Sequence, residues 1–255
     1  MADHSLDILL PAFLAGLLVL ATHVPLGRLV LERGIVFIDL AIAQVAGLGV
    51  VIADFLGWEI GGWSVQASAV AAALLSAAFL VWTEKHLPVL QEAVIGVVFV
   101  FAASAEIILF GFNPHGAEHL KDLLVGQILW VTPEQLIPAA ILYAGVVAAC
   151  IFLDLARRRL LFYFVFALTV TASVQLVGVF LVFASLIVPS VAARVAGSRR
   201  PLPFAYAFGL IGYLIGLLSS AFLDFPTGAA IVCALGLMLA GTLVTAIWRG
   251  GVAVR

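Results

Sequence analysis

The sequence is poor in charged residues. Asp, Glu, Lys and Arg make up 10% of its 255 residues, whereas 65% are hydrophobic and the mean hydropathy is +1.26. Soluble domains are about one quarter charged and about half apolar, so this composition excludes a soluble globular protein. The connections between the apolar runs are too short to hold a soluble domain. We therefore expect a single integral membrane domain over residues 1–255.

Lysine and cysteine are also scarce. The chain has two lysines, and neither lies in a GxxxxGK[ST] string, which excludes a phosphate-binding loop of that type. If ATP drives this protein, a separate subunit must hydrolyse it. Cys150 and Cys233 lie in apolar runs without a CxxC pair, and we interpret them as small buried side chains. Nothing in the sequence indicates a permanently bound cofactor or a nucleic-acid partner.

Apolar runs recur along the chain at lengths of about 20 residues, enough to cross roughly 30 Å of hydrocarbon as a helix. They predict an all-α transmembrane bundle, surrounded by membrane lipid. Gly212 and Gly216 have the GxxxG spacing that allows two helices to pack closely. The predicted spans are 7–26, 35–56, 64–83, 91–111, 134–153, 203–223 and 227–248.

The basic residues predict the topology. All Lys and Arg except Lys121 fall on one side of the predicted spans, and the acidic segments 54–59 and 113–122 fall on the other. By the positive-inside rule, the basic side is cytoplasmic. We therefore expect a multi-pass protein with its N-terminus outside and its C-terminus inside.

The apolar block 160–188 has basic clusters on both sides and must enter and leave on the same side. It provides about 43 Å of helix, too little for two full crossings of roughly 30 Å each. We expect a partial or re-entrant hairpin that turns near 171–178, which brings the bundle to about 8–9 membrane segments. Its freed backbone groups must be buried among other helices.

A short basic segment follows Pro189. Small residues and Arg194, Arg199 and Arg200 separate two apolar runs there. We interpret this segment as a short helix on the cytoplasmic surface that a soluble partner contacts. An ordinary basic loop is the alternative.

Two carboxylates, Asp39 and Glu106, fall within predicted spans. A charge in hydrocarbon costs about 3 kcal/mol, so such groups face a cavity or a partner. An oxygen-rich site of this kind could bind a divalent cation. The alternative is a structural hydrogen bond between helices.

The outer segment HGAEH carries His115, Glu118 and His119. Two His four residues apart on a helix could capture a metal ion. The string also matches the HxxEH of some zinc peptidases, but no His follows it to complete such a site, and Lys121 would repel a cation. A solvated loop is the other interpretation.

Several segments resemble the membrane subunit of metal-ion ABC importers, the zinc, manganese and iron permease family. The most specific is LTVTASVQLVGVFLVFASLIVPSVAARVA (168–196), which is similar to the family block VGVLLVSALLVIPAATARLL. The others are LGRLVLERGIVFIDLAIAQVAGLGV (26–50), QEAVIGVVF (91–99), KDLLVGQILWVTPEQL (121–136) and LDFPTGA (223–229).

The resemblance implies a type II ABC importer fold in a bacterial cytoplasmic (inner) membrane. It implies a homodimer that works with a separate ABC ATPase, which binds ATP, and with an extracytoplasmic metal-binding protein. The cargo would be a divalent metal, zinc or manganese. The segment after Pro189 would be the coupling helix for the ATPase, with the residues Ser190, Ala193, Arg194, Gly197, Arg199 and Arg200.

The chain departs from the family at its metal gate. The family has Asp and His four residues apart in its second helix, and Asp39 matches the Asp, but the His position is Ala43. Gln44 is the nearest polar residue, and Gln is a poor ligand for divalent metals. Either other groups rebuild the gate, with 115–119 as a candidate, or the cargo differs.

We therefore predict the permease of an ATP-driven divalent metal importer, with Asp39, Gln44 and Glu106 in the metal pathway. An intramembrane metallopeptidase built on 115–119 is one alternative. An ion-coupled secondary carrier that uses Asp39 and Glu106 is another.

Overall fold

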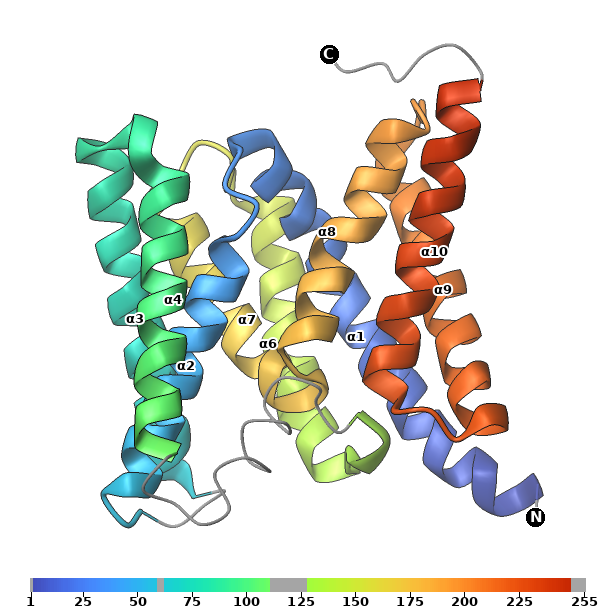
Figure 1. Ribbon diagram of the computed structural model, residues 1–255, viewed down its shortest axis with the longest axis horizontal. Coiled ribbons are helices and arrows are strands. Elements are labelled where there is room, and N and C mark those ends of the chain that lie inside the picture. Colours follow the sequence, from blue (N-terminus) through green and yellow to red (C-terminus); the bar gives the residue numbers. More distant parts are fainter. Residues whose placement is uncertain (1, 59–61, 111–127, 249–255) are drawn as a thin grey trace.

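The computed structural model describes residues 2–58, 62–110 and 128–248, which are helical almost throughout (Figure 1). Within these ranges, eight helices are long and apolar enough to cross a membrane, and α8 is shorter. The prediction of an all-α, multi-span bundle is confirmed. The helices are α1 (Ala2–Arg33), α2 (Ile38–Phe55), α3 (Trp63–His86), α4 (Gln91–Phe110), α6 (Pro133–Phe152), α7 (Arg159–Val177), α8 (Val179–Val195), α9 (Pro201–Leu223) and α10 (Thr227–Trp248), with 3-10 turns η1 (Pro88–Leu90) and η2 (Ile128–Trp130).

The first helix is longer than predicted, because α1 continues past its apolar run to Arg33. Gly34 ends it in the left-handed conformation, at φ 69°. The Gly34 N–H donates to the Leu31 carbonyl and the Ile35 N–H to the Val30 carbonyl, each at 3.3 Å. This pairing is a Schellman motif, which fixes the direction in which the chain leaves the helix.

Helices α7 and α8 form the predicted hairpin. Gly178 alone separates them, at φ 82° and ψ 161°, a conformation essentially restricted to glycine. The turn falls at the end of the predicted 171–178 range, and α8, with 17 residues, is the shorter arm. Both arms lie in the middle of the molecule, between α2–α4 on one side and α9–α10 on the other (Figure 1). They are therefore surrounded by other helices, as a broken membrane segment requires.

The prediction of a separate helix after Pro189 is wrong. Helix α8 continues through Pro189 to Val195, and a second Schellman motif caps it at Gly197. There the Gly197 N–H donates to the Arg194 carbonyl (3.1 Å) and the Ser198 N–H to the Ala193 carbonyl (3.2 Å). Proline is tolerated inside membrane helices where neighbouring helices support the backbone. The predicted coupling segment is thus the capped end of a buried helix.

Glycines allow two close helix contacts. An added Cβ at Gly27 of α1 would overlap the carbonyl oxygen of Leu186 in α8. At Gly216 of α9 it would overlap the backbone of Ile231 in α10, and at Gly212 a side chain of α10. The packing role predicted for the GxxxG spacing is confirmed.

The outer faces of the bundle are apolar. Large hydrophobic side chains such as Phe101 of α4 and Leu237 of α10 are more than two thirds exposed. Such faces suit contact with lipid tails. Cys150 is half-buried, but Cys233 is exposed. The predicted burial of Cys233 is wrong because α10 turns that apolar face outward.

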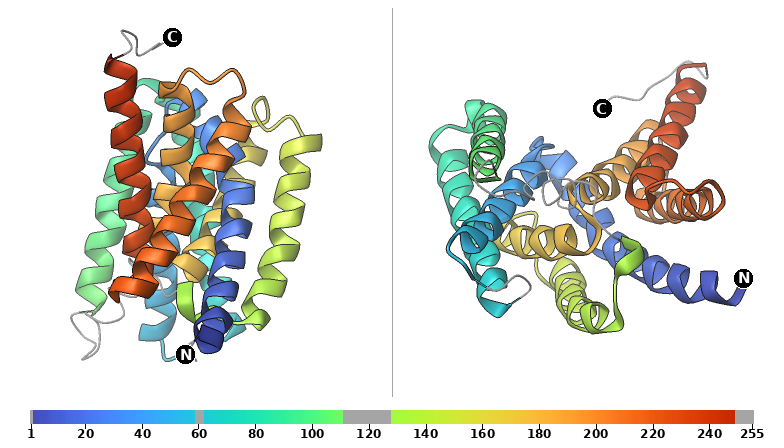
Figure 2. Two further views of the ribbon diagram at one scale, coloured as in Figure 1. Left: turned by 90° about the vertical axis from the view of Figure 1, so that its right-hand side faces the viewer. Right: turned by 60° about the horizontal axis from the view of Figure 1, so that its bottom comes forward.

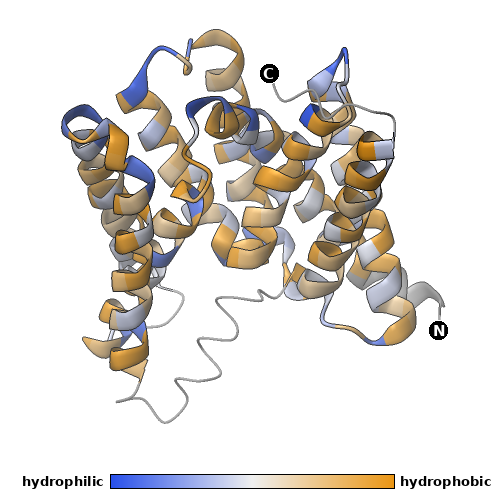
Figure 3. Ribbon diagram, turned by 45° about the horizontal axis from the view of Figure 1, so that its top comes forward, coloured by the Kyte–Doolittle hydropathy of each residue, from blue (hydrophilic) through white to orange (hydrophobic). Residues whose placement is uncertain are grey.

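Basic side chains gather at one end of the bundle, which we call the basic end. Ion pairs there join α1 and α7 to α3. Figure 3 shows hydrophilic residues concentrated at this end, and Figure 2 shows that α1 begins at the opposite end. The basic side chains of the described connections and helix ends there are Arg28, Arg33, Lys85, Arg157, Arg158, Arg159, Arg194, Arg199 and Arg200.

Candidate transport and coupling sites

Asp39 lies in the first turn of α2, where the free backbone amides of a helix N-terminus favour an acidic side chain. It is 1% exposed. Neither carboxylate oxygen has a hydrogen-bond partner within the described part of the chain. A buried carboxylate costs free energy unless a proton, a cation or a donor reaches it. Asp39 is therefore placed to accept a proton or a cation.

Gln44 of α2 and Glu106 of α4 meet in the core. Gln44 Nε2 donates to Glu106 Oε2, and both side chains are buried. Oε1 of Gln44 and Oε1 of Glu106 have no hydrogen-bond partner among the described residues. Two oxygen acceptors from two helices suit a hard cation, and the bond itself also ties the helices together. The structure thus brings together two of the three predicted pathway residues.

Asp39 stands apart from this pair. Five residues along α2 turn the helix by about 140° and advance it by about 7.5 Å, so Asp39 and Gln44 point in different directions. Ala43, which takes the place of the family histidine, lies on nearly the same side as Asp39 and is buried. Gln44 is therefore no substitute for that histidine beside Asp39. The polar groups therefore form two separate candidate cation sites, which we call stations. One is Asp39, and the other is the pair of Gln44 and Glu106.

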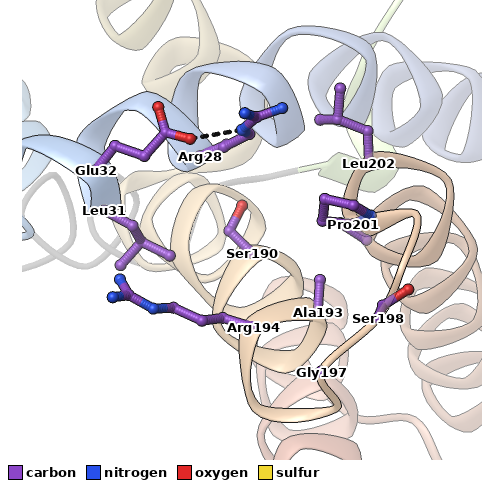
Figure 4. A pocket seen from close by; sticks show the side chains of 11 residues that line it. Arg28, Leu31, Glu32, Ser190, Ala193, Arg194, Gly197, Ser198, Pro201 and Leu202 are labelled. Carbon is purple, nitrogen blue, oxygen red and sulfur yellow. Dashed lines mark hydrogen bonds and ion pairs between the residues drawn. The ribbon is translucent and has the colours of Figure 1, made fainter. Parts of the chain in front are cut away.

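A pocket of about 490 Å³ lies at the basic end, between α1, α8 and α9 (Figure 4). Four of the predicted coupling residues line it, namely Ser190, Ala193, Arg194 and Gly197, whereas Arg199 and Arg200 are not among its lining residues. The coupling role of these four residues stays a prediction, and the structure shows that they share one pocket.

The α1 wall of the pocket was not predicted. Arg28, Leu31 and Glu32 line it, and Arg28 Nε donates to Glu32 Oε1 at 2.7 Å. Opposite charges four residues apart are a recognisable helix pattern. The pattern could have extended the first predicted helix as far as Glu32, but not placed it beside α8.

Arg33 is the centre of a second polar cluster at the basic end. Its Nη2 donates to the carbonyl oxygens of Leu155 and Ala156, each at 3.0 Å, in the connection between α6 and α7. Its guanidinium also lies 3.9 Å from Glu84 of α3 and 4.4 Å from the centre of the Phe162 ring of α7. These contacts fasten the end of α1 to two other helices.

The predicted outer metal-capture group, His115, Glu118 and His119, lies outside the described residues and stays a prediction. In ranges 2–58, 62–110 and 128–248, no group of three or more His, Cys, Asp and Glu is arranged to hold a metal ion.

The candidate spans are those of a polytopic membrane protein, and two of them carry a buried carboxyl group. The chain belongs to the ABC 3 transport family, which matches residues 5–157 and 151–246. It is the membrane permease of a metal ABC importer, and ATP hydrolysis belongs to a separate subunit. The family also implies that a binding protein works with the complex.

Known proteins resemble the chain over nearly its whole length. The high-affinity zinc uptake system membrane protein ZnuB of Haemophilus influenzae is 23% identical over 248 residues, which cover 89% of this chain and 93% of the relative. The manganese transport system membrane protein MntC of Halalkalibacterium halodurans is 27% identical over 256 residues, with coverages of 88% and 85%. PsaBC from Streptococcus pneumoniae, solved in complex with Fab, has the same fold, with a TM-score of 0.72 at 19% identity and coverages of 97% and 95%.

Proposed function

We propose that this permease imports a divalent transition metal, zinc or manganese, through a homodimer that is coupled to two ATPase subunits. The family membership supports metal import, and relatives named for zinc and for manganese cover most of the chain. The observation that carries the proposal is the set of buried oxygen atoms without partners on Asp39, Gln44 and Glu106.

The two stations on α2 suggest an order of passage. Glu106 lies in the last turns of α4, away from the basic end, whereas Asp39 lies in the first turn of α2. A cation that enters opposite the basic end reaches Gln44 and Glu106 first and Asp39 afterwards. The two carboxyl groups would bind the cation in exchange for a proton, and the amide of Gln44 holds Glu106 in place without adding a charge of its own.

The basic end would face the cytoplasm, following the positive-inside rule. The ATPases would dock there over the pocket of Figure 4, and a metal-loaded binding protein would dock at the opposite end. Closure of the ATPases on ATP would push on the end of α8 and switch access to the pathway from one side to the other. This alternating access moves the metal inward without covalent chemistry in the permease.

The test is metal uptake into liposomes that contain the permease and its ATPase, with the binding protein added outside. We expect ATP-dependent uptake of zinc or manganese from a panel that also includes iron and nickel. Uptake without ATP would contradict the proposal, as would a lack of uptake for every metal.

The two alternatives drawn from the sequence are not retained. A chain that belongs to a family of ABC transport permeases is neither a peptidase nor an ATP-independent carrier. Residues 115–119 keep only their predicted role in metal capture.

A further inference from the structure

We propose that the last turns of α1, from Arg28 to Arg33, form a second wall of the ATPase docking surface and carry its movement to Asp39. The inference rests on the proposed function, because it takes the basic end as the place where the ATPase docks. The coupling residues predicted from the sequence all lie on α8 and the connection after it, and none lies on α1.

The docking pocket is shared between α1 and α8. Arg28, Leu31 and Glu32 line it from α1, and Figure 4 shows the side chain of Arg194 on α8 reaching toward Leu31. Just before Arg28, the backbones of the two helices touch at Gly27, where even a methyl group would not fit. A partner that covers the end of α8 therefore also contacts α1, and the two helix ends move together.

The charges of the pocket indicate which surface of the ATPase fits. Three charged side chains line the pocket, namely Arg28, Glu32 and Arg194, and Arg199 and Arg200 lie in the connection between the lining residues Ser198 and Pro201. The pocket lining between these charged side chains includes the apolar side chain of Leu31. The complementary surface carries an acidic side chain beside an apolar one, and opposite charges of this kind set the orientation of docking.

On its other side, the end of α1 is fastened by Arg33. Its side chain is 12% exposed and binds the α6–α7 connection through two backbone carbonyls. It also faces Glu84 on α3, which is 14% exposed. A guanidinium that makes several contacts in a fixed plane holds its partners more rigidly than a single charge does. The end of α1 therefore pivots on Arg33 when the pocket side is pushed.

The connection from α1 to α2 consists of residues 34–37, and these residues contact neighbouring helices. After the Schellman motif at Gly34, the Val36 N–H donates to Glu92 Oε1 of α4 at 2.8 Å. Phe37 stacks on Phe183 of α8, with ring centres 6.3 Å apart and planes within 3°. Asp39 follows in the first turn of α2. Such a connection transmits displacement, so movement at Arg28 reaches Asp39.

The experiment measures ATPase retention, ATP hydrolysis and metal uptake together in the reconstituted complex. Arg28→Glu reverses one charge in the pocket, and we expect it to weaken retention of the ATPase on the purified permease at least about fivefold. Arg33→Lys keeps the charge that faces Glu84 but loses the planar fork that reaches both carbonyls. We expect it to retain the ATPase and hydrolyse ATP normally while moving at least about fivefold fewer ions per ATP.

Arg157 provides matched controls, because its side chain is 88% exposed and pairs with its neighbour Asp154 at 3.2 Å. Arg157→Glu and Arg157→Lys should behave as the unaltered protein. The docking role of α1 is refuted if Arg28→Glu retains the ATPase as well as Arg157→Glu does. The movement role is refuted if Arg33→Lys transports as many ions per ATP as Arg157→Lys.

The proposed function fails in a different way, because the unaltered complex would then show no ATP-dependent uptake of any metal. Gel filtration in detergent checks that each variant folds. If Arg28→Glu or Arg33→Lys aggregates, Arg28→Gln or Arg33→Gln takes its place under the same criteria.

Discussion

At the scale of single residues, the pair of Gln44 and Glu106 explains how the chain tolerates a carboxylate among apolar helices. The amide supplies a hydrogen bond to one carboxyl oxygen but carries no charge, so it leaves Glu106 able to bind a cation. A lysine or arginine in place of Gln44 would instead neutralise the carboxylate. The residue types at this contact are therefore compatible with the proposed cargo-binding role.

Glu106→Gln tests this role. The variant keeps the shape of the pair and a hydrogen bond to Gln44 but removes the carboxyl group that can ionise. We expect normal folding and a loss of metal uptake of about 10- to 100-fold, the range typical of groups that hold a metal in place. The measurement is uptake in liposomes alongside thermal unfolding in detergent. Glu134→Gln, which alters an exposed carboxylate at the start of α6, is the control. Unchanged uptake in Glu106→Gln would leave the pair a structural contact.

Asp39→Ala tests the second station. The side chain makes no hydrogen bond within the part of the chain that the structure describes, so its removal should not lower the melting temperature. We expect uptake to be lost while the permease still binds its ATPase. Uptake close to that of the unaltered protein would exclude Asp39 from the pathway and leave the family assignment intact.

At the scale of elements, the contact between α1 and α8 leaves no room for a side chain at Gly27. The hydrophobic runs predicted that both helices exist, but not that their backbones touch at Gly27 and Leu186. Helices in lipid gain little from hydrophobic burial against each other, so close packing at small residues holds them together.

Gly27→Ala should push α1 and α8 apart. Overlap of this kind lowers the free energy of unfolding by about 1–3 kcal/mol. The matched control is Gly145→Ala in α6, where an added Cβ has nothing within 4 Å and the expected change is under about 1 kcal/mol. The measurement is the melting temperature of each variant in detergent, which should fall further in Gly27→Ala than in Gly145→Ala. Equal melting temperatures would contradict the close contact.

Local signals account for what the sequence could predict of the elements. Apolar length located the spans, and the basic clusters around 160–188 required a hairpin that Gly178 then makes. Pro189 misled the prediction, because the usual helix-breaking rule does not hold where neighbouring helices support the backbone. Asp39 and Glu106 stood out as charges in hydrocarbon, but the partnership of Glu106 with Gln44 depends on the packing of α2 against α4. The α1 wall of the pocket likewise depends on distant segments that meet only in the folded chain.

At the scale of the whole molecule, the position of the basic end predicts the direction in which the metal is transported. The pocket, the cluster at Arg33 and the described basic residues all lie at this end. Its placement in the cytoplasm can be tested independently of transport.

Single cysteines at Ser5 and Ser198, in a chain whose two native cysteines are changed to serine, should report the orientation. We expect a membrane-impermeant thiol reagent to label Ser5→Cys in intact cells and Ser198→Cys only after the membrane is opened. The reverse pattern would place the basic end outside and overturn the proposed direction of import.

The hairpin of α7 and α8 has a mechanical consequence of its own. The chain enters α7 and leaves α8 at the basic end, and the tip of the hairpin is the buried turn at Gly178, which joins these two helices only. The hairpin is thus connected to the rest of the chain at the basic end alone. Because no connection to a further helix leaves at that tip, a displacement of the α8 end at the basic end reaches Gly178 without altering a loop between helices at the opposite end.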